Sequence, residues 1–246
     1  MKIIVSGDWH LDWSTAGLPR FDDGRAAVEV VLEAARREGA ELFVFLGDLT
    51  NPESVRAHRA VGVAVDVATR LWFGAGIASR WLVGNHDVIE DGSGCSSLEP
   101  LRALAEALPR GRESSDQGIK VYDRPTVETF RGKRLLALPF TPRSHAYDPT
   151  TVALEVWSNS RDQVAAVFGH LNVEGLEPGS EVADMPRGRE VVLPVSKLDS
   201  YWPTARVFNG HYHRRQLFGR VHVPGSLQRL TFGEEQNSPG YLIAEV

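Results

Sequence analysis

The sequence contains a single cysteine, Cys95, among its 246 residues. An internal disulfide is therefore excluded, which favours a reducing compartment such as the cytoplasm. No apolar run approaches the roughly 20 residues that a membrane-spanning helix needs. The first residues read directly as a strand, without the long apolar region and cleavage site of a signal peptide. These absences predict a cytoplasmic protein with no membrane association.

The chain also lacks an excess of positive charge, since its formal net charge is −5. This value argues against a generic nucleic-acid binder. The charge is unevenly distributed, however. The segment from Arg187 to Arg229 contains eight basic residues and two acidic ones, which gives it a local charge of +6. The segment predicts a local anion-binding surface, although arginines scattered over a solvated surface would give the same pattern.

The length suits one large α/β domain, and we expect a single domain over residues 1–246. Hydrophobic periodicity predicts helices over residues 23–38, from an N-cap at Asn51 to about residue 72, and over 98–108. Strands are predicted at residues 2–6, 41–46, 77–83, 119–122, 126–130, 134–138, 164–168, 206–209, 216–218, 221–223 and 241–246. Residues 171–190 read as a long loop. The change from helix–strand alternation to consecutive strands predicts a mixed sheet or a second sheet.

Five apolar, strand-like runs end in glycine followed by a residue that can bind a metal. The five places are Gly7-Asp8, Gly47-Asp48, Gly84-Asn85-His86-Asp87, Gly169-His170 and Gly210-His211-Tyr212-His213. A lone Gly-Asp or Gly-His is almost always a turn, but the ordered set predicts one site beyond the strand ends, where α/β sheets collect ligands. Its donors are oxygens and imidazoles without a thiolate, a set that suits Mn²⁺, Fe²⁺ or Zn²⁺.

At these motifs the sequence resembles the calcineurin-like metallophosphoesterase superfamily over nearly its whole length. The resemblance implies an α/β fold with a two-sheet mixed β-sandwich flanked by helices. It also implies two divalent metal ions. The first would be held by Asp8, His10, Asp48 and His213, and the second by Asp48, Asn85, His170 and His211. Asp48 would bridge the two ions, and His86 would lie over the leaving group.

Two further stretches, residues 170–175 and 224–235, resemble the SbcD-type branch of DNA-repair nucleases. This branch implies a Mn²⁺-dependent DNA exonuclease or endonuclease that uses a hydroxide activated by two metals. The implied partners are DNA, an SbcC-type ATPase subunit and a second copy of the chain. The region where the family's capping domain and ATPase-docking helices would begin is absent from this sequence. Asn51 stands where these nucleases usually carry a second histidine, and it could orient His86.

The predicted catalytic residues are therefore His86, Asp87 and Asn51. The predicted nucleic-acid contacts are Arg187, Arg189, Arg214 and Arg215. Two other functions remain open on the sequence. The acidic charge and the missing cap favour a phosphodiesterase or phosphatase for small molecules such as cyclic nucleotides. A non-catalytic subunit that binds DNA ends is the third, although such a protein has no need of a complete ligand set.

Overall fold

The computed structural model describes residues 1–51, 54, 56–88, 95–108, 118–140, 164–179, 192–193 and 195–246. Most of the predicted loop over residues 171–190, with Arg187 and Arg189, lies outside the described residues. Among the helices described, none is long and apolar enough to cross a membrane.

The first sheet has the strand order β15-β1-β4-β5-β6. Its strands are β1 (Lys2–Ser6), β4 (Leu42–Phe45), β5 (Ala78–Leu82), β6 (Ile119–Tyr122) and β15 (Leu242–Glu245). The first four are parallel, and β15 pairs antiparallel with β1. Since the parallel strands all point the same way, the loops that follow them emerge at one edge of the sheet.

The second sheet has the order β13-β14-β12-β9-β8-β7. Its strands are β7 (Thr126–Phe130), β8 (Lys133–Leu138), β9 (Val164–Gly169), β12 (Arg206–Asn209), β13 (Gln216–Phe218) and β14 (Val221–Val223). The central strands β8, β9, β12 and β14 are parallel, and β7 and β13 pair antiparallel at the two edges. Two short pairs, β2 (Ser14–Thr15) with β3 (Leu18–Pro19) and β10 (Asn172–Val173) with β11 (Val192–Leu193), were not expected from the sequence.

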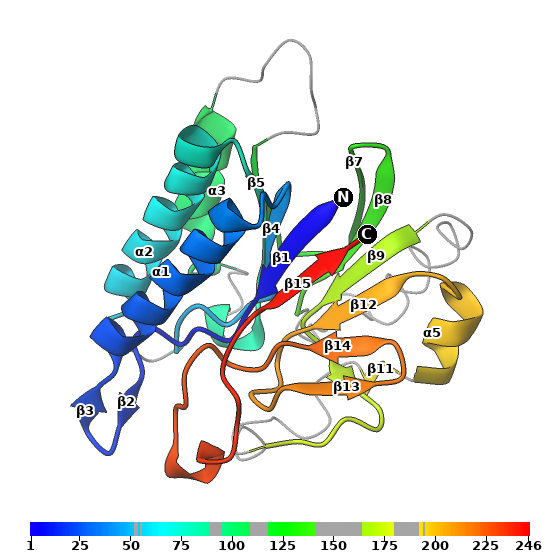
Figure 1. Cartoon of the computed structure of the whole chain (residues 1–246). Coiled ribbons are helices and arrows are strands. Elements are labelled where there is room, and N and C mark those ends of the chain that lie inside the picture. Colours follow the sequence, from blue (N-terminus) through cyan, green and yellow to red (C-terminus); the bar gives the residue numbers. More distant parts are fainter. Residues whose placement is uncertain are drawn as a thin grey trace.

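The helices lie outside the two sheets (Figure 1). They are α1 (Phe21–Arg37), α2 (Ala57–Thr69), α3 (Glu99–Ala107) and α5 (Val195–Tyr201). Helix α2 continues into one π-helical turn, Arg70–Gly74, and two 3₁₀ turns span Asn85–Asp87 and Phe232–Glu234. Helices α1, α2 and α3 cover the outer face of the first sheet, and α5 lies beside the second sheet.

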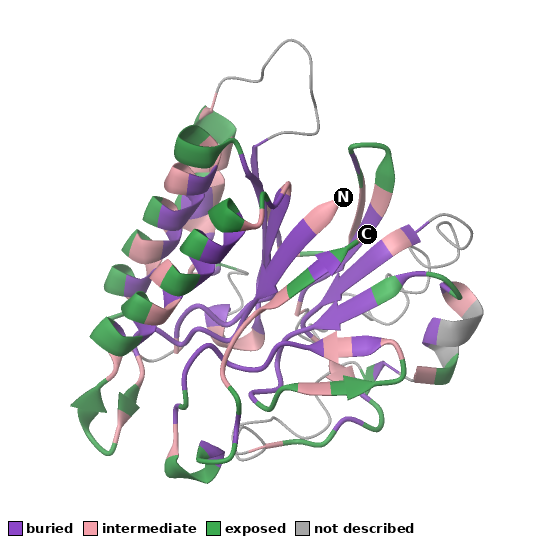
Figure 2. Ribbon diagram, viewed as in Figure 1, coloured by how far each residue is buried: buried purple, intermediate pink, exposed green. Residues whose placement is uncertain are grey.

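Three buried clusters hold these layers together. On β1, Ile4 joins the cluster packed against α1 and α2, while Ile3 and Val5 join the cluster between the sheets. This alternation follows from the two-residue period of a strand, and both faces of the sheet are apolar because both are covered. A third cluster, with Val207 and Trp202, packs around the second sheet and α5. The buried strands stand out in Figure 2. The predicted two-sheet mixed sandwich flanked by helices is confirmed.

The predicted N-cap at Asn51 is wrong. Helix α2 begins at Ala57, with Arg56 as its N-cap residue. The backbone N–H of Asn51 instead donates to Asp12 Oδ1 at 2.9 Å, and its carbonyl accepts from the Ser54 N–H at 3.0 Å. A tertiary contact with the segment after β1 therefore holds Asn51 in a turn before the helix.

A buried ion pair joins the two sheets. Arg80 on β5 is 1% exposed and donates to Glu128 on β7, which also binds Lys120 Nζ at 2.6 Å. Glu128→Ala should lower the free energy of unfolding by about 3 kcal/mol, because it leaves a buried guanidinium without its counter-charge. Urea denaturation would measure the loss. In Glu177→Ala, which breaks an exposed pair with Arg214, the change should stay below about 1 kcal/mol; equal losses in both variants would contradict this role of Arg80.

Candidate metal centre

The predicted ligands all lie just beyond strand ends. Asp8 and His10 follow β1, Asp48 follows β4, and Asn85 follows β5. His170 follows β9, and His211 and His213 follow β12. Four of these residues adopt left-handed backbone conformations, namely Asp8 (φ 51°), His10 (φ 39°), Asp48 (φ 61°) and His211 (φ 75°). Such conformations cost free energy and concentrate at functional sites, so these loops are shaped for something other than stability.

At two positions directly before predicted ligands, neighbouring loops approach the backbone so closely that only glycine fits. A Cβ at Gly84 would overlap the carboxylate of Asp48, and one at Gly47 would lie 2.5 Å from the His170 ring. Gly47 also has φ 105°, which other residues rarely adopt. Gly47 and Gly84, each directly before a predicted ligand, therefore let neighbouring loops pack closely enough to bring these side chains together.

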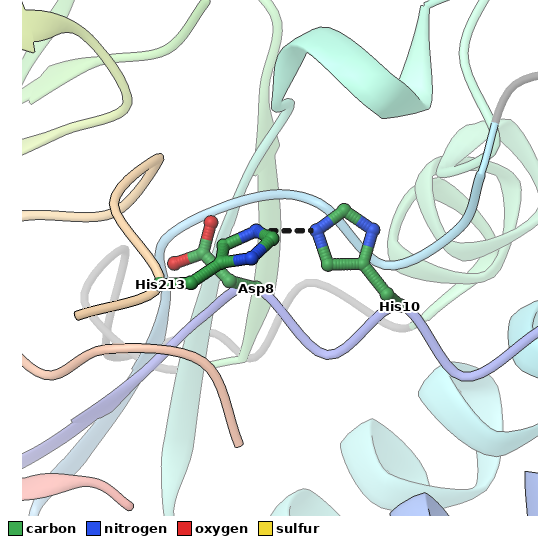
Figure 3. A group of neighbouring side chains, drawn as sticks. All are labelled: Asp8, His10 and His213. Carbon is green, nitrogen blue, oxygen red and sulfur yellow. Dashed lines mark hydrogen bonds between the residues drawn. The ribbon is translucent and has the colours of Figure 1, made fainter. Parts of the chain in front are cut away.

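The first cluster consists of Asp8, His10 and His213, all buried, with candidate ligand atoms within 4.8 Å of one another. The rings of His10 and His213 face each other with their Nε2 atoms 3.2 Å apart, and the Asp8 carboxylate lies beside them (Figure 3). At most one of two facing nitrogens can donate a proton to the other, so this geometry suits a shared cation as well as a hydrogen bond.

The second cluster consists of Asp48, His170 and His211, whose candidate ligand atoms also lie within 4.8 Å of one another. Asn85 Oδ1 joins it, lying 2.9 Å from His170 Nε2 and 2.9 Å from His211 Nδ1. His170 Nδ1 bonds the Leu46 carbonyl at 2.7 Å, which requires the proton on Nδ1 and turns Nε2 toward the cluster.

One oxygen of Asp48 faces both clusters. Its Oδ2 lies 3.7 Å from His10 Nε2 and 3.3 Å from His170 Nε2. Its Oδ1 accepts the backbone N–H of His86 at 2.9 Å, which fixes the orientation of the carboxylate. A carboxylate held between two ligand clusters can bridge two cations.

The residues present fit divalent cations. Asp8 Oδ2 and His10 Nδ1 are buried and have no hydrogen-bond partner in the part of the chain that the structure describes. A buried carboxylate oxygen without a partner is costly, and a cation at this cluster would remove the cost at Asp8 Oδ2. The set of oxygen and imidazole donors without thiolate is also that of catalytic divalent-metal sites.

The electrostatics of the site favour positive charge. Burial raises the pKa of Asp8 to about 7, against the nearby His170. Burial alone would raise the pKa of Asp48, yet His170 and His86 hold it well below its usual range. Burial would lower the pKa of His170, but Asp48 and Asp8 raise it to about 9. A proton on His170 thus takes the position that a cation would occupy, and a cation held by this cluster would displace that proton.

His86 and Asp87 have different surroundings. His86 is half-buried, and its ring lies 4.9 Å from that of His10 between centroids. Asp87 is buried and accepts four hydrogen bonds, from the N–H groups of Gly84, Asp48 and Leu49 and from Ser97 Oγ. Burial raises the pKa of Asp87 to about 6, although these four donors favour the ionised form. The contacts of Asp87 hold the loops after β4 and β5 in place, and its predicted catalytic role stays a prediction.

The remaining predicted residues lie at the margin of the centre or outside the described residues. Arg214 and Arg215 are exposed and follow His213 directly, and Arg214 Nη1 pairs with Glu177 at 2.5 Å. Arg187 and Arg189 lie outside the described residues. The described contacts of Asn51 with its neighbours are made by its backbone, so the action of its side chain on His86 stays a prediction.

Sequence reasoning missed two buried carboxylates near the centre. Asp12 is buried two residues after His10, and its Oδ1 accepts the backbone N–H of Asn51 at 2.9 Å. Glu234 is buried and binds His213. Neither follows a strand that ends in glycine, so the pattern that identified the other residues could not find them. The resemblance singled out the stretch that contains Glu234, but it assigned that residue no function.

This chain is similar in sequence to two known proteins and similar in fold to a solved structure. The chain is 24% identical to Exonuclease subunit 1 of Enterobacteria phage T4, over 98% of this chain and 63% of that protein. It is 23% identical to the SbcD component of the nuclease SbcCD from Staphylococcus epidermidis, over 100% of this chain and 66% of that protein. The chain thus spans about two thirds of the length of these relatives. A dimetal phosphatase from Danio rerio has the same fold, with a TM-score of 0.51, 11% identity and coverage of 99% of this chain and 91% of that one.

The family model of the calcineurin-like phosphoesterases matches residues 1–215, which contain every predicted metal ligand. The fold of that family implies a dinuclear divalent metal site, and the two clusters that meet at Asp48 are its candidate ligands. The chain therefore belongs to the calcineurin-like phosphoesterase family.

Proposed function

We propose that this phosphoesterase is a Mn²⁺-dependent DNA nuclease. The observation that carries the proposal is the convergence of two ligand clusters on Asp48 Oδ2, an arrangement suited to in-line attack on a phosphodiester. The DNA substrate is supported by the two relatives described as nucleases or exonucleases, each of which is similar to nearly all of this chain. Manganese is proposed because the oxygen and imidazole donors suit it.

When bound, two divalent metals would activate water and neutralise the charge that develops on the phosphate. The protein's own groups must then supply a proton to the departing oxygen. His86 is the best candidate, because its half-buried ring stands beside His10 at the edge of the first cluster. The bond from its backbone N–H to Asp48 Oδ1 ties the position of His86 to the proposed bridging carboxylate. We therefore assign His86 as the general acid.

A parallel assay would test the substrate class. Purified protein with Mn²⁺ would be given end-labelled duplex DNA, single-stranded DNA and a cyclic nucleotide under the same conditions. We expect cleavage of DNA, with single-stranded or frayed ends cut better than duplex interior, because unpaired strands reach buried metal ligands more easily. Turnover of the cyclic nucleotide far above that of any DNA would reject the nuclease in favour of the alternative below.

The alternative is a phosphodiesterase or phosphatase for small molecules. The net charge of −5 favours it, because DNA-binding surfaces are basic. The ion pair between Arg214 and Glu177 also favours it, since it engages one of the proposed phosphate contacts.

The arginines after His213 separate the two substrates. Replacing Arg214 and Arg215 together with glutamine should weaken DNA binding and flatten its salt dependence by roughly one ion for each arginine that binds a phosphate. Hydrolysis of a small phosphodiester should stay near normal, because that substrate does not extend to these side chains. Binding isotherms at several salt concentrations would measure the change.

Arg36 and Arg37 provide the matched control, because they form an adjacent exposed pair in the last turn of α1. That end of the helix leads into the N-terminal end of β4, whereas the predicted metal ligands follow the C-terminal ends of the strands. The same double substitution there should leave the salt slope unchanged. If both pairs of substitutions give the same slope, Arg214 and Arg215 do not contact DNA.

A further inference from the structure

The segment after β14, residues 224–237, folds back over the candidate metal centre. The N–H of Ser226 bonds the carbonyl of His213 at 3.1 Å, and the N–H of Leu227 lies 3.4 Å from the carbonyl of Asp8. The segment lies beyond residues 1–215, which the family model matches. It nevertheless contacts the backbone of two residues in the first cluster.

Of the two acidic residues in this segment, Glu234 is buried and Glu235 is exposed. The side chain of Glu234 is 1% exposed. Oε1 lies 2.8 Å from His213 Nδ1, and Oε2 accepts the backbone N–H of Leu230 at 2.7 Å. Burying a carboxylate is costly unless both oxygens are bonded, and here each oxygen has a partner inside the protein. A carboxyl group kept at such a site calls for a reason beyond the closing of a turn.

The contact with Glu234 determines which nitrogen of His213 carries the proton. An ionised carboxylate can only accept, so Nδ1 must donate and Nε2 keeps its lone pair. That Nε2 is the atom that faces His10 in the first cluster. The Nδ1 atom of His10, by contrast, has no hydrogen-bond partner among the described residues. His213 is therefore the imidazole of the first cluster whose orientation an acidic side chain fixes.

We propose that Glu234 is a positioning residue that holds His213 ready to bind a cation at the cluster of Asp8, His10 and His213. The proposal rests on the metal-dependent function proposed above. It predicts a selective effect, because the side chain of Glu234 binds His213, which belongs to the first cluster and not to the second.

Glu234→Gln is the sharpest test because the amide has nearly the same shape. Its single oxygen can accept from Leu230 N–H, which leaves an NH₂ group facing His213 Nδ1. That group favours the tautomer with the proton on Nε2, which competes with a cation. Glu235→Gln is the matched control, since Glu235 is the next residue and is exposed.

Calorimetric titration of the metal-free protein with Mn²⁺ would measure both sites. In Glu234→Gln we expect one site to weaken by about 10–100-fold, the range for loss of a histidine's outer partner, and the other to change little. Glu235→Gln should match the parent. Unchanged affinity at both sites would overturn the proposal, as would an equal loss at both. Should Glu234→Gln fail to fold, Glu234→Asp retains the charge at a shorter reach and is expected to weaken the same site, but less.

Nitrogen NMR of the metal-free protein labelled in histidine would read the tautomer directly. We expect His213 to carry its proton on Nδ1 in the parent protein and in Glu235→Gln, and to lose that preference in Glu234→Gln. The same tautomer in all three proteins would overturn the proposal. These readouts do not depend on the substrate. A protein that binds Mn²⁺ with this selectivity but cleaves no phosphodiester would refute the proposed function and leave the role of Glu234 standing.

Discussion

Asp48→Asn is expected to abolish hydrolysis and to weaken both metal sites together. The substitution replaces the one carboxylate whose Oδ2 faces both clusters with a neutral amide. The loss of affinity should exceed the ~10–100-fold that follows from removing an outer partner of a ligand, because a bridging charge between two dications is lost. Metal content after dialysis and turnover of a phosphodiester would both be measured.

The fold should survive this substitution, since asparagine accepts the left-handed conformation of Asp48 (φ 61°) as readily as aspartate does. Asp22→Asn provides the control, because the Asp22 side chain on α1 is 93% exposed. Near-normal turnover with two metals retained would show that Asp48 is not the bridge.

His86→Ala is expected to lower the rate by about 10²–10⁴-fold, the range for loss of a general acid. Metal content should be unchanged, because the proposed ligands do not include the His86 ring. The bond from residue 86 to Asp48 Oδ1 is made by the backbone and survives the substitution. Steady-state kinetics with DNA and with a p-nitrophenyl phosphodiester would test the assignment.

The defect should shrink on the p-nitrophenyl substrate, whose leaving group needs little protonation. His58→Ala, on the exposed surface of α2, should behave like the parent protein on both substrates. An equal defect on both substrates, or loss of metal from His86→Ala, would mean that His86 is a ligand or a structural residue.

The parts of the fold that follow from local pattern could be predicted from the sequence. The continuous apolar run of β4 and the strands at Thr126–Phe130 and Arg206–Asn209 were found within a residue of their ends. Burial on both faces of a sheet leaves such a pattern in the sequence itself. The glycines before predicted ligands also leave a pattern in the sequence, because the close packing of loops at Gly47 and Gly84 allows no larger residue.

What failed depends on residues that are distant in the sequence. The start of α2 was misplaced because Asp12, 39 residues away, binds the backbone of Asn51. Glu234 was missed because its partner His213 is 21 residues away in the sequence, with strands β13 and β14 between them. The π-helical turn that ends α2 has the same apolar spacing as the helix before it, so periodicity extended the helix through it. Helix-capping preferences and hydrophobic periodicity depend only on residues close in the sequence, whereas these contacts are set by the tertiary fold.

The pairing of β1 with β15 has a consequence for the order of events during synthesis. The Met1 amino group bonds the carbonyl of Val246 across a separation of 245 residues. Such a contact closes last, since the ends of a long loop must meet before the pairing is rewarded. Strand β1, which leads to Asp8 and His10, therefore remains at a sheet edge until β15 has left the ribosome. Glu234 lies on that same closing segment. The seven predicted metal ligands are thus made before β15, the last strand to pair with β1, and Glu234 can bind His213 only after this closing segment has folded back.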